Sequence, residues 1–134
     1  MSFKTGLNTE FFEGSALVGL NIANTGEVLD VKDVESAIKK VSEGINYVFS
    51  GTITPTKILV AGKNKNYEEN AALVWTSIYP RFPLEKETFK KDFLNFIGEL
   101  LTELKQDRTA INFTDESLMI ETEHCKNPDL RWKF

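Results

Sequence analysis

The most reactive residue types in this chain stand side by side. His124 and Cys125 are the only histidine and the only cysteine among 134 residues. A cysteine nucleophile needs a base that meets it in space, whereas neighbours on a strand point to opposite faces. The pair is also too small for a zinc site unless three subunits contribute. The sequence therefore favours a structural role for both residues.

Carboxylates gather just before this pair. Asp115 and Glu116 lie in an expected turn, and Glu121 and Glu123 share one face of the strand that follows. Such a cluster could hold a cation or supply a general acid. Charges on an exposed sheet edge also suppress unwanted strand pairing, and the sequence favours this second interpretation.

Two further regions, one loop and one strand, contain candidates for ligand binding. Tyr79, Arg81 and Phe82 stand on a proline-stiffened loop before a helix, where an arginine can hold an anion. The alternative, which the sequence favours, is a rigid connector whose rings pack on the sheet. Asn112 interrupts the apolar strand "RTAINF". It is either a site residue or an inward amide that satisfies neighbouring backbone groups, and the sequence supports both equally.

Motifs and charge exclude several classes of function. There is no glycine-rich phosphate loop, no Gly-x-Ser-x-Gly and no His/Cys metal spacing, so we expect no cofactor and no metal. Residues 67–134 hold thirteen acidic and nine basic side chains, against seven of each in residues 1–66. This balance argues against a nucleic-acid partner. Without an apolar run of roughly 20 residues or a secretory signal, we expect a cytoplasmic protein and no membrane contact.

The elements that must position these residues occur in a repeated order. Apolar residues at the helical period predict helices over 31–43 and 85–105. Apolar strands precede the helices at 15–22 and 71–78, and two strands follow each helix. The linkers between those later strands, Thr54-Pro55-Thr56 and Thr114-Asp115-Glu116, have the composition of turns.

The order strand, helix, strand, strand thus occurs twice, in pseudo-repeats 15–62 and 71–123. Ala16-Leu17-Val18 matches Ala72-Leu73-Val74 at a spacing of 56 residues. A duplicated βαββ unit predicts an α+β fold: one domain over 15–134, a sheet of four or more strands, and both helices on one face. Residues 1–14 form an N-terminal extension. Two helices leave the other sheet face uncovered, so we expect an oligomer.

At this point the sequence resembles a known family. "ALVWTSI", a long amphipathic helix and "DRTAINFTD" are similar to the second half of the tautomerase superfamily, the family of macrophage migration inhibitory factor. The aromatic Trp132 also fits that family's C-terminal region. The resemblance implies a homotrimer whose three sheets surround a central barrel, with a small pocket at each subunit boundary.

The family's catalytic residue is missing. The tautomerases use an N-terminal proline, and the equivalent place here falls at Ser15 or Ala16, so proline-dependent activity is not expected. The resemblance places Asn112 in the pocket, and Ala110 stands where the family often has a tyrosine.

Two hypotheses for function follow. The first is a cytosolic homotrimer that binds a small ligand at the subunit interface through Asn112, with Tyr79, Arg81, Ser15 and Ala16 nearby. The alternative is an acidic protein-binding module, of the inhibitor or immunity type, that covers a basic protein partner.

Overall fold

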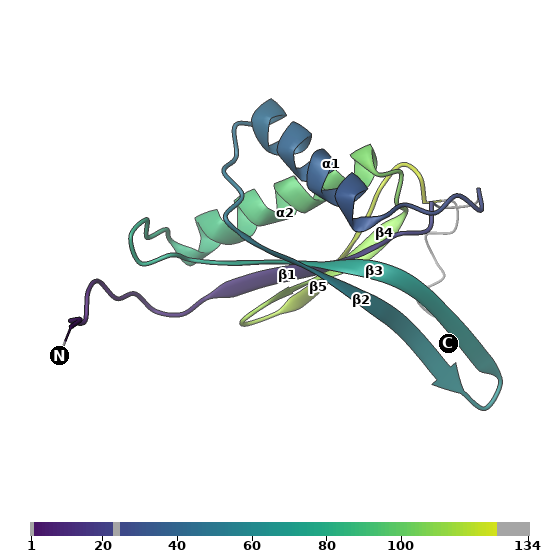
Figure 1. Cartoon of the computed structure of the whole chain (residues 1–134), viewed down its shortest axis with the longest axis horizontal. Coiled ribbons are helices and arrows are strands. Elements are labelled where there is room, and N and C mark those ends of the chain that lie inside the picture. Colours follow the sequence, from purple (N-terminus) through teal and green to yellow (C-terminus); the bar gives the residue numbers. More distant parts are fainter. Residues whose placement is uncertain (1, 23–24, 126–134) are drawn as a thin grey trace.

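The structure is a computed structural model that describes residues 2–22 and 25–125 (Figure 1). Its elements are β1 (Glu13–Gly19), α1 (Val31–Gly44), β2 (Gly51–Gly62), β3 (Lys65–Ser77), α2 (Lys86–Glu103), β4 (Arg108–Phe113) and β5 (Ser117–Glu121). The five strands form one sheet, and the two helices pack on one of its faces. The α+β class and both predicted helices are confirmed. Trp132 lies outside the described residues.

The sheet has the strand order β2-β3-β1-β4-β5, and every neighbouring pair is antiparallel. Helix α1 therefore connects β1 to β2 across β3, and α2 connects β3 to β4 across β1. These are two interleaved split βαβ units, with β5 added as a hairpin. The duplicated βαββ unit is not confirmed, although Leu17 and Leu73, which the repeat equates, are direct partners on β1 and β3.

The turn expected at Thr54-Pro55-Thr56 is wrong. Strand β2 continues through these residues, and the chain reverses at Lys63 and Asn64 instead. Proline is tolerated here because β2 is an edge strand, where its missing N–H need not remove a ladder hydrogen bond. The result is a long β2–β3 hairpin whose outer half, 57–62 with 65–70, extends beyond the end of β1 (Figure 1).

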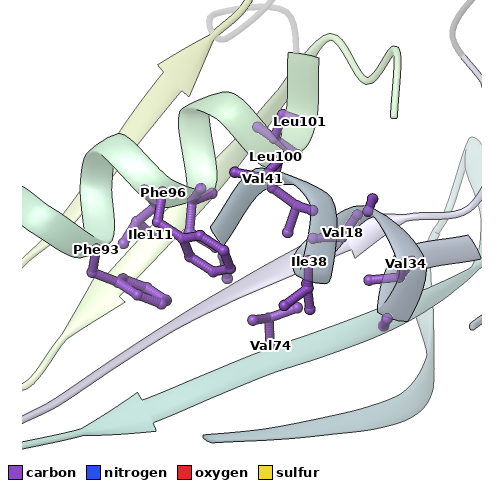
Figure 2. Close-up of a cluster of buried hydrophobic side chains, with 14 of the residues drawn as sticks. Val18, Val34, Ile38, Val41, Val74, Phe93, Phe96, Leu100, Leu101 and Ile111 are labelled. Atoms are coloured by element: carbon purple, nitrogen blue, oxygen red, sulfur yellow. The ribbon is translucent and has the colours of Figure 1, made fainter. Parts of the chain in front are cut away.

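The core lies between the helices and the sheet. Alternate strand residues such as Val18, Val74 and Ile111 are fully buried under the apolar stripes of α1 and α2. Figure 2 shows these side chains facing Phe93, Phe96, Leu100 and Leu101 of α2 and Val34, Ile38 and Val41 of α1. Burying one such side chain contributes about 1.5–3 kcal/mol, so this face determines which side of each strand turns inward.

The first helix begins at a reciprocal cap. The Asp30 carboxylate accepts a hydrogen bond from the Asp33 N–H at 3.0 Å, and the Asp30 N–H donates to the Asp33 carboxylate at 2.9 Å. This capping box satisfies two backbone donors and fixes where α1 starts over the sheet.

No helix covers the second face of the sheet within the described residues (Figure 1). Alternation places Leu17, Leu73 and Trp75 on this face, and Leu17 is 36% exposed although Ala16 and Val18 beside it are fully buried. Met119 on β5 is half exposed. Within the described residues no helix is long and apolar enough to cross a membrane.

Candidate functional site

The structure separates the residues that the sequence grouped into one pocket. Ser15 and Asn112 are direct partners on β1 and β4, on the helix-free face. The Asn112 side-chain oxygen accepts a hydrogen bond from the Ser117 hydroxyl at 2.6 Å. Ala16 is fully buried on the helix side, and it does not line the cavity that contains Asn112. Tyr79 and Arg81 line a different cavity from Asn112.

A cavity of about 440 Å³ lies where the overhanging β2–β3 hairpin meets β1 and β4. We call it the hairpin cavity. Its lining combines apolar side chains with charged and polar ones: Leu17, Gly19, Asn21, Ile22, Ile58, Tyr67, Glu69, Gln106, Asp107, Arg108, Thr109, Ala110 and Asn112. The size suits a small ligand.

The carboxylate of Glu69 is held in the hairpin cavity by two hydrogen bonds. One carboxylate oxygen accepts a hydrogen bond from the Tyr67 hydroxyl at 2.6 Å, and the other accepts from the Asn21 backbone N–H at 2.9 Å. A Cβ atom at Gly19 would lie 2.4 Å from the second oxygen. Only glycine at this position leaves room for the carboxylate where it stands.

The charged groups that act on Tyr67 in the hairpin cavity are carboxylates. Its hydrogen bond to Glu69, then partial burial, then the charges of Glu69 and Asp107 raise the pKa of Tyr67 to about 12. The phenol therefore stays protonated near neutral pH and continues to donate to Glu69. Arg108 lies in the same lining, with its Nε 3.9 Å from an Asp107 carboxylate oxygen. The arrangement can attract a cation beside an aromatic ring and apolar side chains.

Sequence reasoning missed Tyr67 and Glu69. It began the strand at Ala71, because the polar run "KNKNYEEN" before that residue has the composition of a loop. The available signal was alternation: Tyr67, Glu69 and Ala71 lie two residues apart, as the side chains on one face of a strand do.

Two of the acidic candidates, Asp115 and Glu116, and the Cys125 thiol have structural partners. Lys90 contacts the carboxylates of Asp115 at 3.2 Å and Glu116 at 2.5 Å, and the hydrogen bond to Glu116 is the largest cause that raises the pKa of Lys90. The Cys125 sulfur accepts from Arg108 Nη2 at 3.1 Å. Within residues 2–22 and 25–125, no group of His, Cys, Asp or Glu could hold a metal ion.

A second cavity of about 840 Å³ lies between the α1–β2 connection and the β3–α2 connection. We call it the loop cavity. It is mainly lined by aromatic and aliphatic side chains: Tyr47, Val48, Ile78, Tyr79, Phe82, Pro83, Leu84 and Phe89, with Asn46, Ser50, Thr76, Ser77, Arg81 and Asp92.

The Tyr47 ring lines the loop cavity and packs on the core. It stacks on Phe96 at 4.7 Å between ring centroids. Burial, then the charge of Asp92, raises the pKa of Tyr47 to about 12.

Known proteins match this chain in fold. No family model and no curated protein matches the sequence. A solved structure of a phage SAM lyase in complex with S-methyl-5'-thioadenosine has a TM-score of 0.70 at 16% identity, over 91% of this chain and 98% of that chain. The apo state of a phage SAM lyase gives a TM-score of 0.69 at 16% identity, over 84% and 90%. The shared property is the fold.

Proposed function

We propose that the protein binds S-adenosylmethionine in the hairpin cavity and cleaves it as a lyase, forming S-methyl-5'-thioadenosine. The observation that carries the proposal is the Glu69 carboxylate, held by Tyr67 and the Asn21 N–H at the edge of a small, partly apolar cavity. A sulfonium ion is a compact cation, and a fixed carboxylate attracts it without having to reorganise. The likeness to the phage SAM lyase over 98% of that chain agrees with this choice of ligand.

Formation of the thioether requires little proton chemistry at sulfur. The bond between the sulfonium sulfur and the aminocarboxypropyl chain breaks, sulfur keeps the bonding electrons, and a neutral thioether leaves. As this bond breaks, the substrate's own carboxylate attacks the chain carbon from the opposite side, which gives a lactone, or a water molecule takes a proton from the neighbouring carbon, which gives an alkene. Both oxygens of Glu69 already accept hydrogen bonds, so in this proposal Glu69 holds the cation and does not take a proton.

Other residues of the hairpin cavity would contact the remainder of the ligand. Leu17 and Ile58 offer apolar surface to the flat nucleoside, and Asn112 offers an amide to its polar edges. The proposal thus keeps Asn112 as a polar ligand contact. It includes no proline-dependent tautomerisation, since Glu13, Gly14 and Ser15 stand at the start of β1.

The proposal also keeps the homotrimer. Leu17, Leu73 and Trp75 on the helix-free face need a cover, and copies of the chain packed face to face would bury them. Such packing would also close the open side of the hairpin cavity, since Leu17 belongs to both surfaces. Sedimentation tests this part separately: a mass three times 15.2 kDa supports it, and a monomer at micromolar concentration contradicts it.

The activity test uses the full chain and S-adenosylmethionine alone. Chromatography should detect S-methyl-5'-thioadenosine in proportion to enzyme and time, and the accompanying lactone or alkene distinguishes the two routes. If the protein neither forms the thioether nor binds either nucleoside in calorimetry, the proposal is wrong. In that case the acidic protein-binding module is the hypothesis to pursue.

A further inference from the structure

Residues 2–11 form an extended segment, here called the arm, that projects from the start of β1 away from the sheet (Figure 1). Three large apolar side chains lie along it at intervals of four residues. Phe3 is 75% exposed, Leu7 74% and Phe11 58%. Single exposed apolar residues are normal on a protein surface, but three in succession on a projecting segment indicate a contact surface.

The base of the arm is fixed to the domain. The Phe12 ring is buried, and its carbonyl accepts a hydrogen bond from the Ile78 N–H at 2.9 Å. Glu10 forms an ion pair with Lys86 at 2.8 Å. These contacts direct residues 2–8 away from the body of the same chain. Extended, those residues reach about 25 Å, enough to touch another molecule.

The loop cavity presents matching surface close to the base of the arm. Val48 is 87% exposed, Phe82 68% and Tyr79 59%, and all three line the loop cavity. Leu84 belongs both to this lining and to a small hollow beside Thr9. The arm and the loop cavity therefore lie at the same end of the molecule, and both expose apolar side chains to water.

We propose that the arm of one copy of this chain occupies the loop cavity of a second copy. Composition favours this occupant: Lys4 is the only charged residue between residues 2 and 9, and the wall of the loop cavity is mainly apolar, with one cation, Arg81, and one anion, Asp92. Buried area agrees. Covering Phe3, Leu7 and Phe11 and an equal wall area removes roughly 800 Å² per arm, and in the proposed homotrimer this adds to the area of the sheet faces towards the roughly 1,600 Å² of a stable interface.

Cysteine trapping between two different variants tests the exchange directly. One variant carries Leu7→Cys and the other Val48→Cys, both in a Cys125→Ser background so that no native thiol reacts. Mixed and then oxidised, they should form a disulfide-linked heterodimer, because a docked arm brings the two thiols together. The matched control replaces Val48→Cys by Leu59→Cys, which is also strongly exposed but lies on the β2–β3 hairpin. Heterodimer yield should exceed this control by at least about tenfold.

Two results overturn the proposal. The first is a heterodimer yield no higher than the control. The second is a double variant, Leu7→Cys with Val48→Cys, that closes into a monomer with an internal disulfide at a rate independent of protein concentration. That outcome would place the arm in the loop cavity of its own chain.

A charge substitution in the arm provides an independent measurement. Leu7→Asp places a carboxylate where apolar contact is proposed, and it should lower the weight-average mass in sedimentation. Asn8→Asp adds the same charge one residue away without removing an apolar side chain, and it should leave the mass unchanged. Equal behaviour of the two variants contradicts the inference. The expected result does not depend on the ligand of the hairpin cavity.

Discussion

The hairpin cavity and the loop cavity lie at opposite ends of β3 and are built in different ways. Tyr67 and Glu69, near the start of β3, contribute to the first, whereas Thr76 and Ser77, at its end, contribute to the second. In the hairpin cavity, two hydrogen bonds hold the Glu69 carboxylate in place. The loop cavity is lined mainly by aromatic and aliphatic side chains of the α1–β2 and β3–α2 connections. One strand thus offers polar groups to a ligand at one end and apolar packing surface at the other, because its two ends have different neighbours.

The largest effect should be a loss of stability when the core beside the loop cavity is changed. Phe96→Ala removes a fully buried ring that stacks on Tyr47 and Phe49 and supports the loop cavity. We expect a loss of about 3–5 kcal/mol in the free energy of unfolding, measured by urea denaturation. A loss below about 1 kcal/mol would mean that the core relaxes around the missing ring.

The next effect should appear only at the hairpin cavity. Glu69→Gln keeps the shape but removes the charge, and turnover of S-adenosylmethionine should fall by about 100-fold. Glu68→Gln is the matched control: Glu68 is the adjacent residue on β3, points to the other side of the strand and is absent from the cavity lining. If both variants lose activity equally, Glu69 has no special role.

Gly19→Ala should displace the same carboxylate without removing it. The new Cβ would stand 2.4 Å from the Glu69 oxygen, so the flexible end of that side chain must move. We expect roughly a tenfold loss of turnover with an unchanged unfolding curve. Gly62→Ala, on the same hairpin with no atom within 4 Å of the added Cβ, is the control. An active Gly19→Ala variant would show that the carboxylate position is not important.

The smallest effect distinguishes Tyr67 from Tyr47, the two tyrosines whose pKa is raised. The hydrogen bond to Glu69 is the main cause at Tyr67, and burial is the main cause at Tyr47. Glu69→Gln should therefore lower the pKa of Tyr67 from about 12 towards 10.0, whereas Asp92→Asn should leave the pKa of Tyr47 raised. Ultraviolet titration, with the other two of the three tyrosines replaced by phenylalanine, measures each. A fall at both residues would contradict the assignment of causes.

The same shift predicts how stability depends on pH. A folded-state pKa of about 12 lies above the ordinary value of 10.0, so folding favours the protonated Tyr67 phenol. This contribution is complete below pH 10.0 and is lost as the pH rises through about 12. Tyr67→Phe should therefore show a smaller loss of stability than the wild type between these values.

Helical periodicity made part of the fold predictable. The apolar stripe that contains Phe89, Phe93 and Phe96 located α2, and alternation correctly assigned Leu17 and Val18 to opposite faces. The continuity of β2 through Pro55 was not predictable, because proline is typical of turns but is also tolerated on an edge strand. Whether a strand lies at an edge depends on the order of the whole sheet, which local composition does not contain.

The candidate site was predictable only in part. Asn112 lines the hairpin cavity, whereas Glu69 lies 43 positions earlier in the sequence and reaches the same cavity only through the strand order β3-β1-β4. Tyr79 and Arg81 follow the opposite end of β3, so proximity along the sequence did not mean a shared site. The homotrimer and the ligand remain predictions.

The overhang of the β2–β3 hairpin has a further consequence for how tightly a ligand is held. In the sheet ladder, residues 65–69 pair only with β2, and a two-stranded ribbon is marginally stable in water without further support. A molecule that contacts both Glu69 and Asn112 would connect this ribbon to β4. Binding would restrict the motion of this ribbon, and the lost conformational entropy would weaken the affinity. A more rigid turn at Lys63 and Asn64 should therefore tighten binding without adding a contact.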